Sequence, residues 1–342
     1  MSRLFVRGCG AVSPAGWGME AFRQALDADT ELPSKPVARP GSTRTMSGRS
    51  VPAPNPRPAL LSHPRLRRAS PISQYASFAA AEALGNDLEL VQTGALRLGV
   101  ILCVTTGCII YTRRFYEGVI ESPATASPLL FPETVFNAPA SHIATLLGTT
   151  ARAYTLLGDH GTILTAFALA AEWLEQGIVD GCVVVAAEEL DWLLTYAIEL
   201  LDRQLPVGEG AGAIYLSSTG PAEGLVEVTG ITDPQLYTRL QSKSQAIRKA
   251  QAELGQLAEG TLLCDGLLGS RKSDRHEAEA WADWRGPRIS PKRILGEALM
   301  ASAAWQCVAA LDLLQRRRYP AGVVSVVGCN EQAIMARLVP AL

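Results

Sequence analysis

The chain has 342 residues, of which 48% are hydrophobic and 19% are charged. This is enough apolar material for one large domain or for two fused halves. The formal net charge is -2, which excludes the strong charge imbalance typical of proteins that bind nucleic acids or membrane surfaces.

The chain carries no sign of export or of membrane insertion. Its first residues, MSRLFVRGCGAVSP, contain no apolar run long enough for a signal-peptide core. Glycine or a charged residue interrupts every later apolar run before it reaches the length of a membrane span. The seven cysteines form no CxxC pair, and most lie in apolar runs, as buried reduced thiols do. We therefore expect a soluble, cytoplasmic protein.

The first predicted elements are a strand at residues 3–7, a glycine-rich turn and a helix at 19–27. Residues 33–72 then hold nine prolines and eight lysines or arginines, with no acidic residue. Proline lacks the backbone donor that regular structure needs, so this composition disfavours helices and strands. We expect a solvated surface loop here, and a docking patch for an acidic partner is the alternative.

Helices and buried strands alternate after this segment. Apolar residues at helical spacing predict a helix over 73–84, ended by Gly85. The next predicted elements are a strand at 98–104, a helix at 137–147 capped by Asn137, a strand at 151–157, a helix at 162–177, a strand at 181–187 and a glycine turn that leads into a strand within 204–217.

The last third of the chain repeats part of this plan, with a strand at 261–266, a helix at 296–316 and a strand at 322–328. The unit TAFALAAEWLEQGIVDGCVVVAAEE is similar to AAWQCVAALDLLQRRRYPAGVVSVVG, because both join an alanine-rich helix to a β-branched strand. This similarity indicates a duplication. Strands that alternate with helices predict a mainly parallel sheet buried on both faces. We expect an α/β protein with related halves, residues 1–218 and 219–342, stacked as a five-layered α-β-α-β-α sandwich.

Short motifs occur along the chain in an order and spacing that a known family shares. The most specific is SPLLFPETVFNAPASHIATLLG (127–148), which precedes the strand at 151–157. The others are VRGCGAVSPAG (6–16), RRASPISQYASFAAAEAL (67–84), AAEEL (186–190), GEGAGAIYL (208–216), CDGLLGSRKSDRHEAEA (264–280) and SPKRILGEALMASAA (290–304). Together they resemble the β-ketoacyl synthase branch of the thiolase-like fold.

The departures from that family fall on its reacting residues. YTLLGDHGTILTAFALA (154–170) resembles the strand, turn and helix that carry the family's nucleophilic cysteine, but His160 stands in its place. The resemblance also puts Asp265 and Glu297 where the family has two histidines. Condensation needs a thiolate and donors that stabilise a developing anion. An imidazole forms no stable thioester and carboxylates repel a malonyl group, so we expect no condensing activity from this chain alone.

If the fold is as expected, His160, Asp265 and Glu297 converge on one pocket. One interpretation is a degenerate site, in which the imidazole and the carboxylates satisfy one another. The other is new chemistry, as an acid–base pair or as ligands of a divalent metal. Nearby carboxylates favour the imidazolium more than a helix N-terminus disfavours it, and an imidazolium is a poor base. This favours the degenerate site, without a metal or cofactor.

The resemblance implies three candidate functions. The first is a non-catalytic subunit of the chain-length-factor type, which pairs with an active ketosynthase paralogue in polyketide, aryl polyene or fatty-acid type biosynthesis and works with an acyl carrier protein. The second is a standalone hydrolase, decarboxylase or lyase that acts on acyl thioesters through His160, Asp265 and Glu297. The third is a homodimeric scaffold without chemistry.

The resemblance also implies where such a partner would bind. In the family, the strand before the nucleophile helix pairs with its counterpart across the dimer. Here that strand has no proline and Arg152 as its one charge, so its edge is unguarded. We expect Arg152, Tyr154 and Leu156 at the dimer contact. From their position, Phe115, Phe131 and Phe136 are expected to shape the acyl tunnel.

Overall fold

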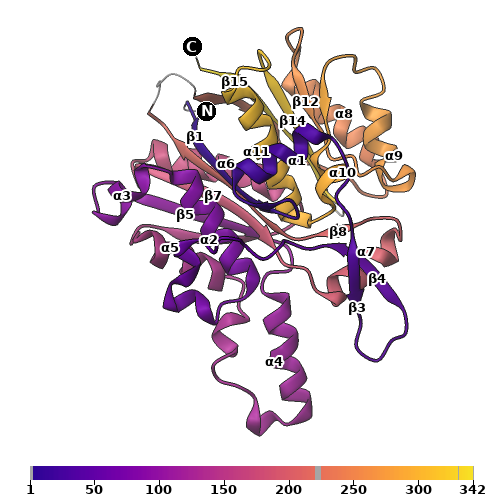
Figure 1. Cartoon of the computed structure of the whole chain (residues 1–342). Coiled ribbons are helices and arrows are strands. Elements are labelled where there is room, and N and C mark those ends of the chain that lie inside the picture. The colour runs from indigo at the N-terminus through magenta and orange to yellow at the C-terminus, as the bar shows by residue number, and fades with distance from the viewer. Residues whose placement is uncertain (1–2, 220–224, 330, 342) are drawn as a thin grey trace.

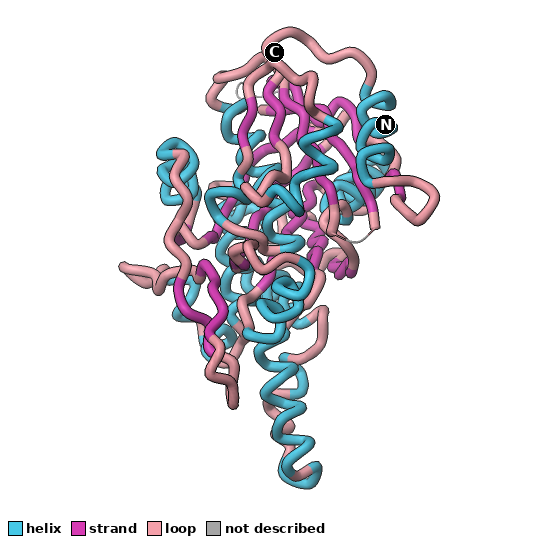
Figure 2. The backbone as a smooth tube through the Cα atoms, turned by 90° about the vertical axis from the view of Figure 1, so that its right-hand side faces the viewer, coloured by secondary structure: helices cyan, strands magenta, loops and turns pink. Residues whose placement is uncertain are grey.

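The computed structural model describes residues 3–219, 225–329 and 331–341. A central sheet is covered by helices, and α4 (Ile109–Glu121) projects from one end of the molecule, as Figures 1 and 2 show from two sides. Within the described ranges, no helix is long and apolar enough to cross a membrane.

One twelve-stranded sheet runs through the molecule. Two short strands, β2 (Gly16–Trp17) and β11 (Gln235–Leu236), pair at its side with β1 and β15. From edge to edge, the other strands are β13 (Arg288–Ile289), β12 (Leu262–Cys264), β14 (Gly322–Val327), β15 (Gln332–Pro340), β10 (Val226–Ile231), β1 (Phe5–Ser13), β9 (Gly210–Ser217), β7 (Gly181–Glu188), β5 (Leu98–Val104) and β6 (Ala153–Leu157).

The two ends of the sheet repeat one pattern of strand directions. β1, β9 and β7 are successively antiparallel, and β7 and β6 flank β5 in parallel. In the same way, β10, β15 and β14 are successively antiparallel, and β14 and β13 flank β12 in parallel. An antiparallel pair between β1 and β10 joins the two sets. Such a repeat is what a duplication would produce.

The prediction of a mainly parallel sheet is wrong, because the parallel pairs of the large sheet are those that β5 and β12 make. β14 ends at Val327 and β15 begins at Gln332, and so short a connection can join only antiparallel strands. The apolar runs did not predict the direction of these strands. A strand covered on both faces is apolar in either direction, so its sequence reports burial and not orientation.

Helix α11 (Leu299–Gln315) forms the centre of the molecule. It is buried from Leu299 to Leu314, and it contacts β7 and β9 at one end of the sheet and β12 and β14 at the other. α6 (Thr162–Glu175) packs in the same core. α2 (Pro71–Leu84) and α5 (Ala138–Leu147) cover the outer face of one half, and α8 (Lys243–Leu254) covers that of the other. Helices and sheet thus alternate in five layers, which confirms the expected α-β-α-β-α architecture.

The remaining helices lie at the ends of strands or on the surface. α4 contains no buried residue, and its mixed composition did not predict a helix. Asn137 stands at the N-cap of α5, as expected, but its side chain makes no capping bond, and Pro139 lies in the first turn. The other helices are α1 (Met19–Ala28), α3 (Asp87–Gln92), α7 (Trp192–Leu201), α9 (Arg271–Ala280), α10 (Pro291–Leu295), and the short 3-10 helices η1 (Ala59–Ser62), η2 (Pro64–Arg67), η3 (Pro123–Thr125) and η4 (Phe131–Glu133).

Residues 33–72 have more regular structure than the proline content predicts. β3 (Lys35–Ala38) and β4 (Thr45–Arg49) form a hairpin, and β4 pairs with β8 (Val207–Gly208) in a small second sheet. Leu61 of η1 and Leu66 of η2 are buried in a small apolar cluster, which fixes the segment against the rest of the protein. The stretch from Val37 to Ser47 carries one proline only, which leaves backbone donors for a hairpin.

Some of the basic side chains in this segment are already neutralised. Arg49 is buried, pairs with Glu31 at 3.0 Å and donates to the backbone carbonyls of Arg293 and Ile294. Arg44 forms an ion pair with Glu199. The segment is therefore partly structural, and a smaller share of its charge is left for an acidic partner.

Candidate functional site

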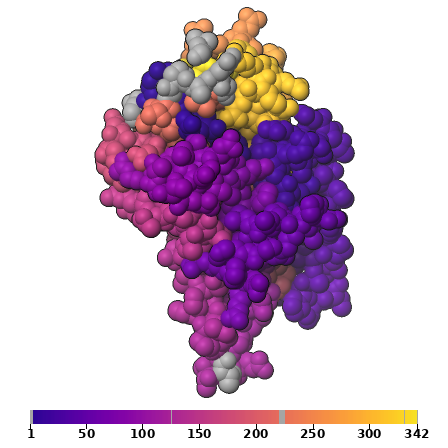
Figure 3. Space-filling model, turned by 60° about the vertical axis from the view of Figure 1, so that its left-hand side comes forward, coloured from indigo at the N-terminus to yellow at the C-terminus, as the bar shows by residue number. Residues whose placement is uncertain are grey.

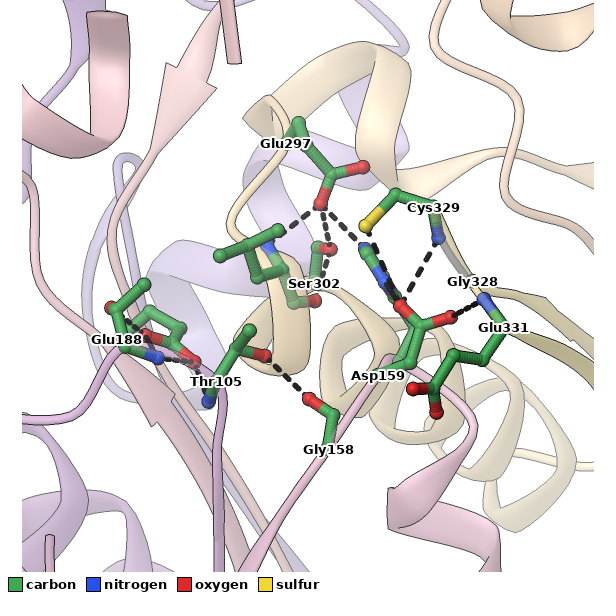
Figure 4. Close-up of polar contacts among 12 residues, drawn as sticks. Thr105, Gly158, Asp159, Glu188, Glu297, Ser302, Gly328, Cys329 and Glu331 are labelled. Carbon is green, nitrogen blue, oxygen red and sulfur yellow. Dashed lines mark hydrogen bonds and ion pairs between the residues drawn. The ribbon is translucent and has the colours of Figure 1, made fainter. Parts of the chain in front are cut away.

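The turn between β6 and α6 carries two buried polar residues, Asp159 and His160. The apolar strand β6 ends at Leu157, and α6 begins at Thr162 with its apolar face in the central core. The turn therefore lies against the central layer, where the start of α11 and the loop after β14 also arrive. Figure 4 shows the polar contacts that result.

Each ring nitrogen of His160 meets a carboxylate. Nδ1 lies 3.0 Å from Asp159 Oδ1, and Nε2 lies 2.8 Å from Glu297 Oε1. Burial and the neighbouring Lys292 ammonium disfavour the imidazolium, but Glu297 and Asp159 outweigh them and hold the pKa of His160 well above its usual value. The protonated ring donates from both nitrogens, so it offers no lone pair to a substrate.

Glu297 is bonded through both of its oxygens. Oε1 also accepts from the Leu299 N–H at 2.6 Å and from Ser302 Oγ at 2.9 Å, and Oε2 lies 3.2 Å from Lys292 Nζ. Burial raises the pKa of a carboxyl group, but Lys292 and His160 together hold that of Glu297 well below its usual range. Glu297 is thus an anion between two cations, and the role of Lys292 in pairing with it was not evident from the sequence.

Asp159 joins this cluster to the C-terminal part of the chain. Its oxygens accept the backbone N–H groups of Cys329 at 3.1 Å and Glu331 at 2.9 Å, both on the loop that follows β14. Burial opposes ionisation, but the His160 ring and the backbone N–H groups of Glu331 and His160 hold the pKa of Asp159 far below its usual value. The described cluster is therefore a carboxylate–imidazolium–carboxylate chain.

Asp265 does not join His160 and Glu297. Its Oδ1 accepts from Ser290 Oγ at 2.6 Å and from the Leu267 N–H at 3.1 Å, and its Oδ2 lies 3.1 Å from Arg288 Nε. Asp265 follows β12 directly, and Arg288 lies on β13, the neighbouring parallel strand, so the sheet brings these two together. The predicted convergence thus holds for His160 and Glu297 and not for Asp265.

A cavity of about 190 Å³ lies beside the cluster. His160, Lys292, Glu297 and Cys329 line it on the side of the cluster. The other side is largely apolar and is formed by Ile198, Leu201, Leu205, Leu268, Leu299 and Val327. Further charged side chains also line the cavity, so its walls are apolar in one part and polar in another.

Two further polar residues of this cavity were not predicted. Glu277 of α9 is buried and accepts from the Gly266 N–H at 3.2 Å and from Ser325 Oγ at 2.9 Å, and burial together with Asp265 raises its pKa to about 8. Glu277 lies within the family-like motif at 264–280, and this motif could have indicated it as a site residue. Lys243 of α8 donates to the Gly328 carbonyl at 2.9 Å, and nothing in its sequence context pointed to the site.

Among the described residues, one group of three metal-binding side chains is close enough together to hold a metal ion. Asp159, His160 and Cys329 each offer a ligand atom, and these atoms lie within 4.8 Å of one another. The set His160, Asp265 and Glu297, which the sequence suggested as ligands, does not meet this spacing.

The three phenylalanines expected in an acyl tunnel do not line the cavity. Phe115 lies on α4 and its ring centroid is 5.5 Å from that of Phe131. Phe131 and Phe136 are exposed. In Figure 3 this part of the chain forms a tapered projection. These aromatic rings therefore belong to a surface of the isolated chain.

β6 is the outermost strand at one end of the sheet, and in the described residues it pairs only with β5. Tyr154 is 46% exposed and packs edge-on against Trp173, with 4.9 Å between ring centroids. Leu156 packs against the central core, and Arg152 lies just before the strand, over the Trp173 ring. The strand expected at a dimer contact is thus a free sheet edge.

Solved structures of known proteins are similar to this chain in fold, although its sequence matches none of the family models or curated proteins searched. The ishigamide ketosynthase/chain length factor superposes with a TM-score of 0.81 at 18% identity, over 99% of this chain and 100% of that one. A β-ketoacyl synthase from Burkholderia phymatum STM815 gives 0.80 at 16% identity, over 100% of both chains. A ketosynthase in complex with its chain length factor from Xenorhabdus doucetiae gives 0.80 at 15% identity, over 99% and 98%. The chain therefore has the thiolase-like fold of these ketosynthases.

Proposed function

We propose that this chain is a non-catalytic subunit of the chain-length-factor type, which pairs through β6 with an active ketosynthase. The observation that carries the proposal is the state of His160. It stands where the resemblance implies a nucleophile, and it donates to Asp159 at 3.0 Å and to Glu297 at 2.8 Å. A doubly bonded imidazolium provides neither a nucleophile nor a general base.

The same contacts argue against a standalone acyl-thioester enzyme. Catalysis by His160 would require loss of a proton that two carboxylates hold, together with rotation out of both bonds. Glu297 is no better placed as an acid, because its pKa is held far below the usual range by Lys292 and His160. Stabilisation of an oxyanion would need donors that are free, and Lys292 is paired with Glu297 at 3.2 Å.

The free edge of the sheet supports a protein partner. Natural edge strands are commonly protected by lysine, proline or a bulge, and β6 has none of these within Ala153–Leu157. Tyr154 and Leu157 are exposed on it. A strand from a second ketosynthase-like chain would complete the ladder, and this is the pairing that the resemblance implies.

The projection around α4 also exposes apolar surface. Its exposed large apolar side chains are Tyr116, Ile120, Leu129, Phe131, Val135 and Phe136. A groove between α5 and β6 is lined by residues from Asn137 to Thr155. Exposed apolar surface of this extent is typical of an interaction site. We propose that Phe115, Phe131 and Phe136 shape an acyl tunnel only once the partner covers them.

Ketosynthase complexes are also prominent among the similar structures. One contains a ketosynthase with its chain length factor, and another contains a type II polyketide synthase acyl-carrier protein bound to its ketosynthase. We propose a carrier protein as the second partner here. Arg67 and Arg68 are exposed at the end of η2 and fit an acidic carrier surface.

Co-expression tests the proposal. The chain would be produced with a ketosynthase that retains its cysteine, purified through a tag on this chain only, and weighed by native mass spectrometry. A complex of about one copy of each chain is expected, because the sheet edge accepts one strand. Recovery of a homodimer with no ketosynthase bound would favour the scaffold instead and refute the pairing.

A further inference from the structure

We propose that Asp159, His160 and Cys329 bind a divalent cation that accepts nitrogen, oxygen and sulfur ligands, of which Zn²⁺ fits best. The sequence suggested His160 as a metal ligand together with Asp265 and Glu297, whereas this site combines it with Asp159 and Cys329. The inference does not depend on the proposed function, because it concerns metal binding and not condensation.

The spacing of the three ligand atoms is close to that of a zinc centre. His160 Nδ1 lies 3.0 Å from Asp159 Oδ1, and Cys329 Sγ lies 3.5 Å from the same oxygen. Zinc binds nitrogen and oxygen at about 2.0 Å and sulfur at about 2.3 Å, so a tetrahedral centre separates N from O by about 3.3 Å and O from S by about 3.5 Å. The third pair, His160 Nδ1 and Cys329 Sγ, lies within 4.8 Å, against about 3.5 Å in a tetrahedral centre. A rotation of the exposed Cys329 side chain would therefore let one ion bridge the three atoms.

Hydrogen bonds to neighbouring residues orient these ligands in the way that is usual in known metal sites. A metal-bound histidine usually donates its other N–H to a carboxylate. Glu297 Oε1 accepts from Nε2 of His160 at 2.8 Å, which leaves Nδ1 for the metal. Lys292 and Ser302 in turn hold Glu297. The second oxygen of Asp159 accepts from the Glu331 N–H at 2.9 Å, so Oδ1 is kept toward His160 and Cys329.

Charge balance also permits the exchange. Zn²⁺ would replace the Nδ1 proton of His160 and the thiol proton of Cys329, so two protons leave as two positive charges arrive. The net charge of the cluster is unchanged, and Asp159 and Glu297 compensate the ion as they compensate the imidazolium. Lys243 and Lys292 face the same cavity and oppose a cation, while Asp274 and Glu277 face it with acidic groups.

The thiol of Cys329 is accessible to a metal ion in solution. Cys329 is exposed, whereas the other six cysteines are buried. His160 and Cys329 both line the cavity, so the fourth coordination position is left to water or to a small ligand from that cavity. An ion there would fasten the loop after β14 to the start of α6, and it would therefore cross between the two halves of the chain.

Metal titration of the full-length protein tests the site. The reduced protein is stripped with a chelator, dialysed against Zn²⁺ and analysed for bound metal, and Co²⁺ is added separately as a spectroscopic probe. We expect about one zinc per chain and a thiolate-to-cobalt charge-transfer band. Cys329→Ser should remove the band and weaken zinc binding at least ~100-fold, since even an outer-shell change costs about 10–100-fold.

The control is His276→Gln, which alters a histidine outside the cluster that bonds Ser244 at 3.0 Å, and it should leave zinc binding unchanged. Circular dichroism verifies that Cys329→Ser is folded, as expected for an exposed position. Absence of stoichiometric zinc in the wild type would overturn the site. So would zinc binding and a cobalt spectrum that persist in Cys329→Ser.

Discussion

His160 Nε2 and Glu297 Oε1 are 2.8 Å apart, although 137 residues separate them in the chain. His160 precedes α6, which follows β6, and Glu297 precedes α11, which follows β13 and α10. β6 and β13 occupy matching edges in the repeated strand pattern. The two helix starts are therefore equivalent positions in the repeated pattern, and they meet in an ion pair.

Replacement of His160 tests the structural role of this pair. His160→Ala should lower the free energy of unfolding by about 3–5 kcal/mol, because it leaves buried carboxylates of Asp159 and Glu297 without their shared cation. Urea unfolding followed by circular dichroism measures the change. Leu240→Ala, at a residue that is 98% exposed, should cost about 0.5 kcal/mol or less. Equal effects of the two substitutions would show that the cluster adds nothing to stability.

The pH dependence of stability has a predicted sign. The raised pKa of His160 means that its stabilisation is complete below its unfolded pKa of about 6.5 and is lost as pH rises through the folded pKa. The lowered pKa values of Asp159 and Glu297 mean that their stabilisation is complete above about 4.5 and is lost in acid. The cluster therefore stabilises most between pH ~4.5 and ~6.5.

The measurement is the difference in unfolding free energy between wild type and His160→Ala, followed from this range into alkaline pH. Glu277, whose pKa is about 8, titrates in both proteins and largely cancels. The difference in unfolding free energy should be largest near pH ~6. It should decrease at alkaline pH, where His160 loses its proton. A difference that grows steadily with rising pH would mean that His160 is neutral in the folded protein.

Gly328 is the position where a single methyl group should open the cluster. A Cβ there would lie 1.6 Å from Asp159 Oδ2, so Gly328→Ala must displace the carboxylate that holds His160 and the Glu331 N–H. The expected cost is about 2–3 kcal/mol, measured by thermal or urea unfolding. Gly230→Ala is the matched control, because its Cβ would have no atom within 4 Å. A neutral Gly328→Ala would show that the loop after β14 moves freely from Asp159.

The sheet edge can be tested without disturbing the core. Tyr154→Lys adds charge to β6 and should weaken binding of the ketosynthase at least about tenfold, as loss of an interface anchor does. Its cost to folding should stay within about 1.5 kcal/mol, the value of one aromatic pair with Trp173. Leu240→Lys, on a residue that is 98% exposed in the other half, should leave affinity unchanged. Titration calorimetry would contradict the proposed interface if both variants bind alike.

The sequence predicted the fold well where burial sets the pattern. The strand at 98–104 coincides with β5, and the helices at 73–84 and 162–177 differ from α2 and α6 only at their ends. These elements are apolar on both faces or along one stripe. Strand direction was predicted wrongly, because it depends on connections such as the turn between β14 and β15 and not on apolar content.

The site was predictable only in part. His160 and Glu297 could be placed together because the resemblance implied that both belong to one site. Asp265 could not be excluded, since its partner Arg288 reaches it through the parallel pairing of β12 and β13. Lys243 and Cys329 carry no motif and enter the cavity through tertiary packing. α4 was missed because it has no buried face to impose a helical period.

A condensation assay addresses the central claim, that this chain completes a ketosynthase and does no chemistry alone. Product formation from malonyl and acyl carrier protein thioesters would be measured for the chain alone, for the co-purified ketosynthase alone and for their complex. We predict product from the complex, little or none from the ketosynthase alone and none from this chain. Thioester turnover by this chain alone, abolished in His160→Ala, would contradict the account.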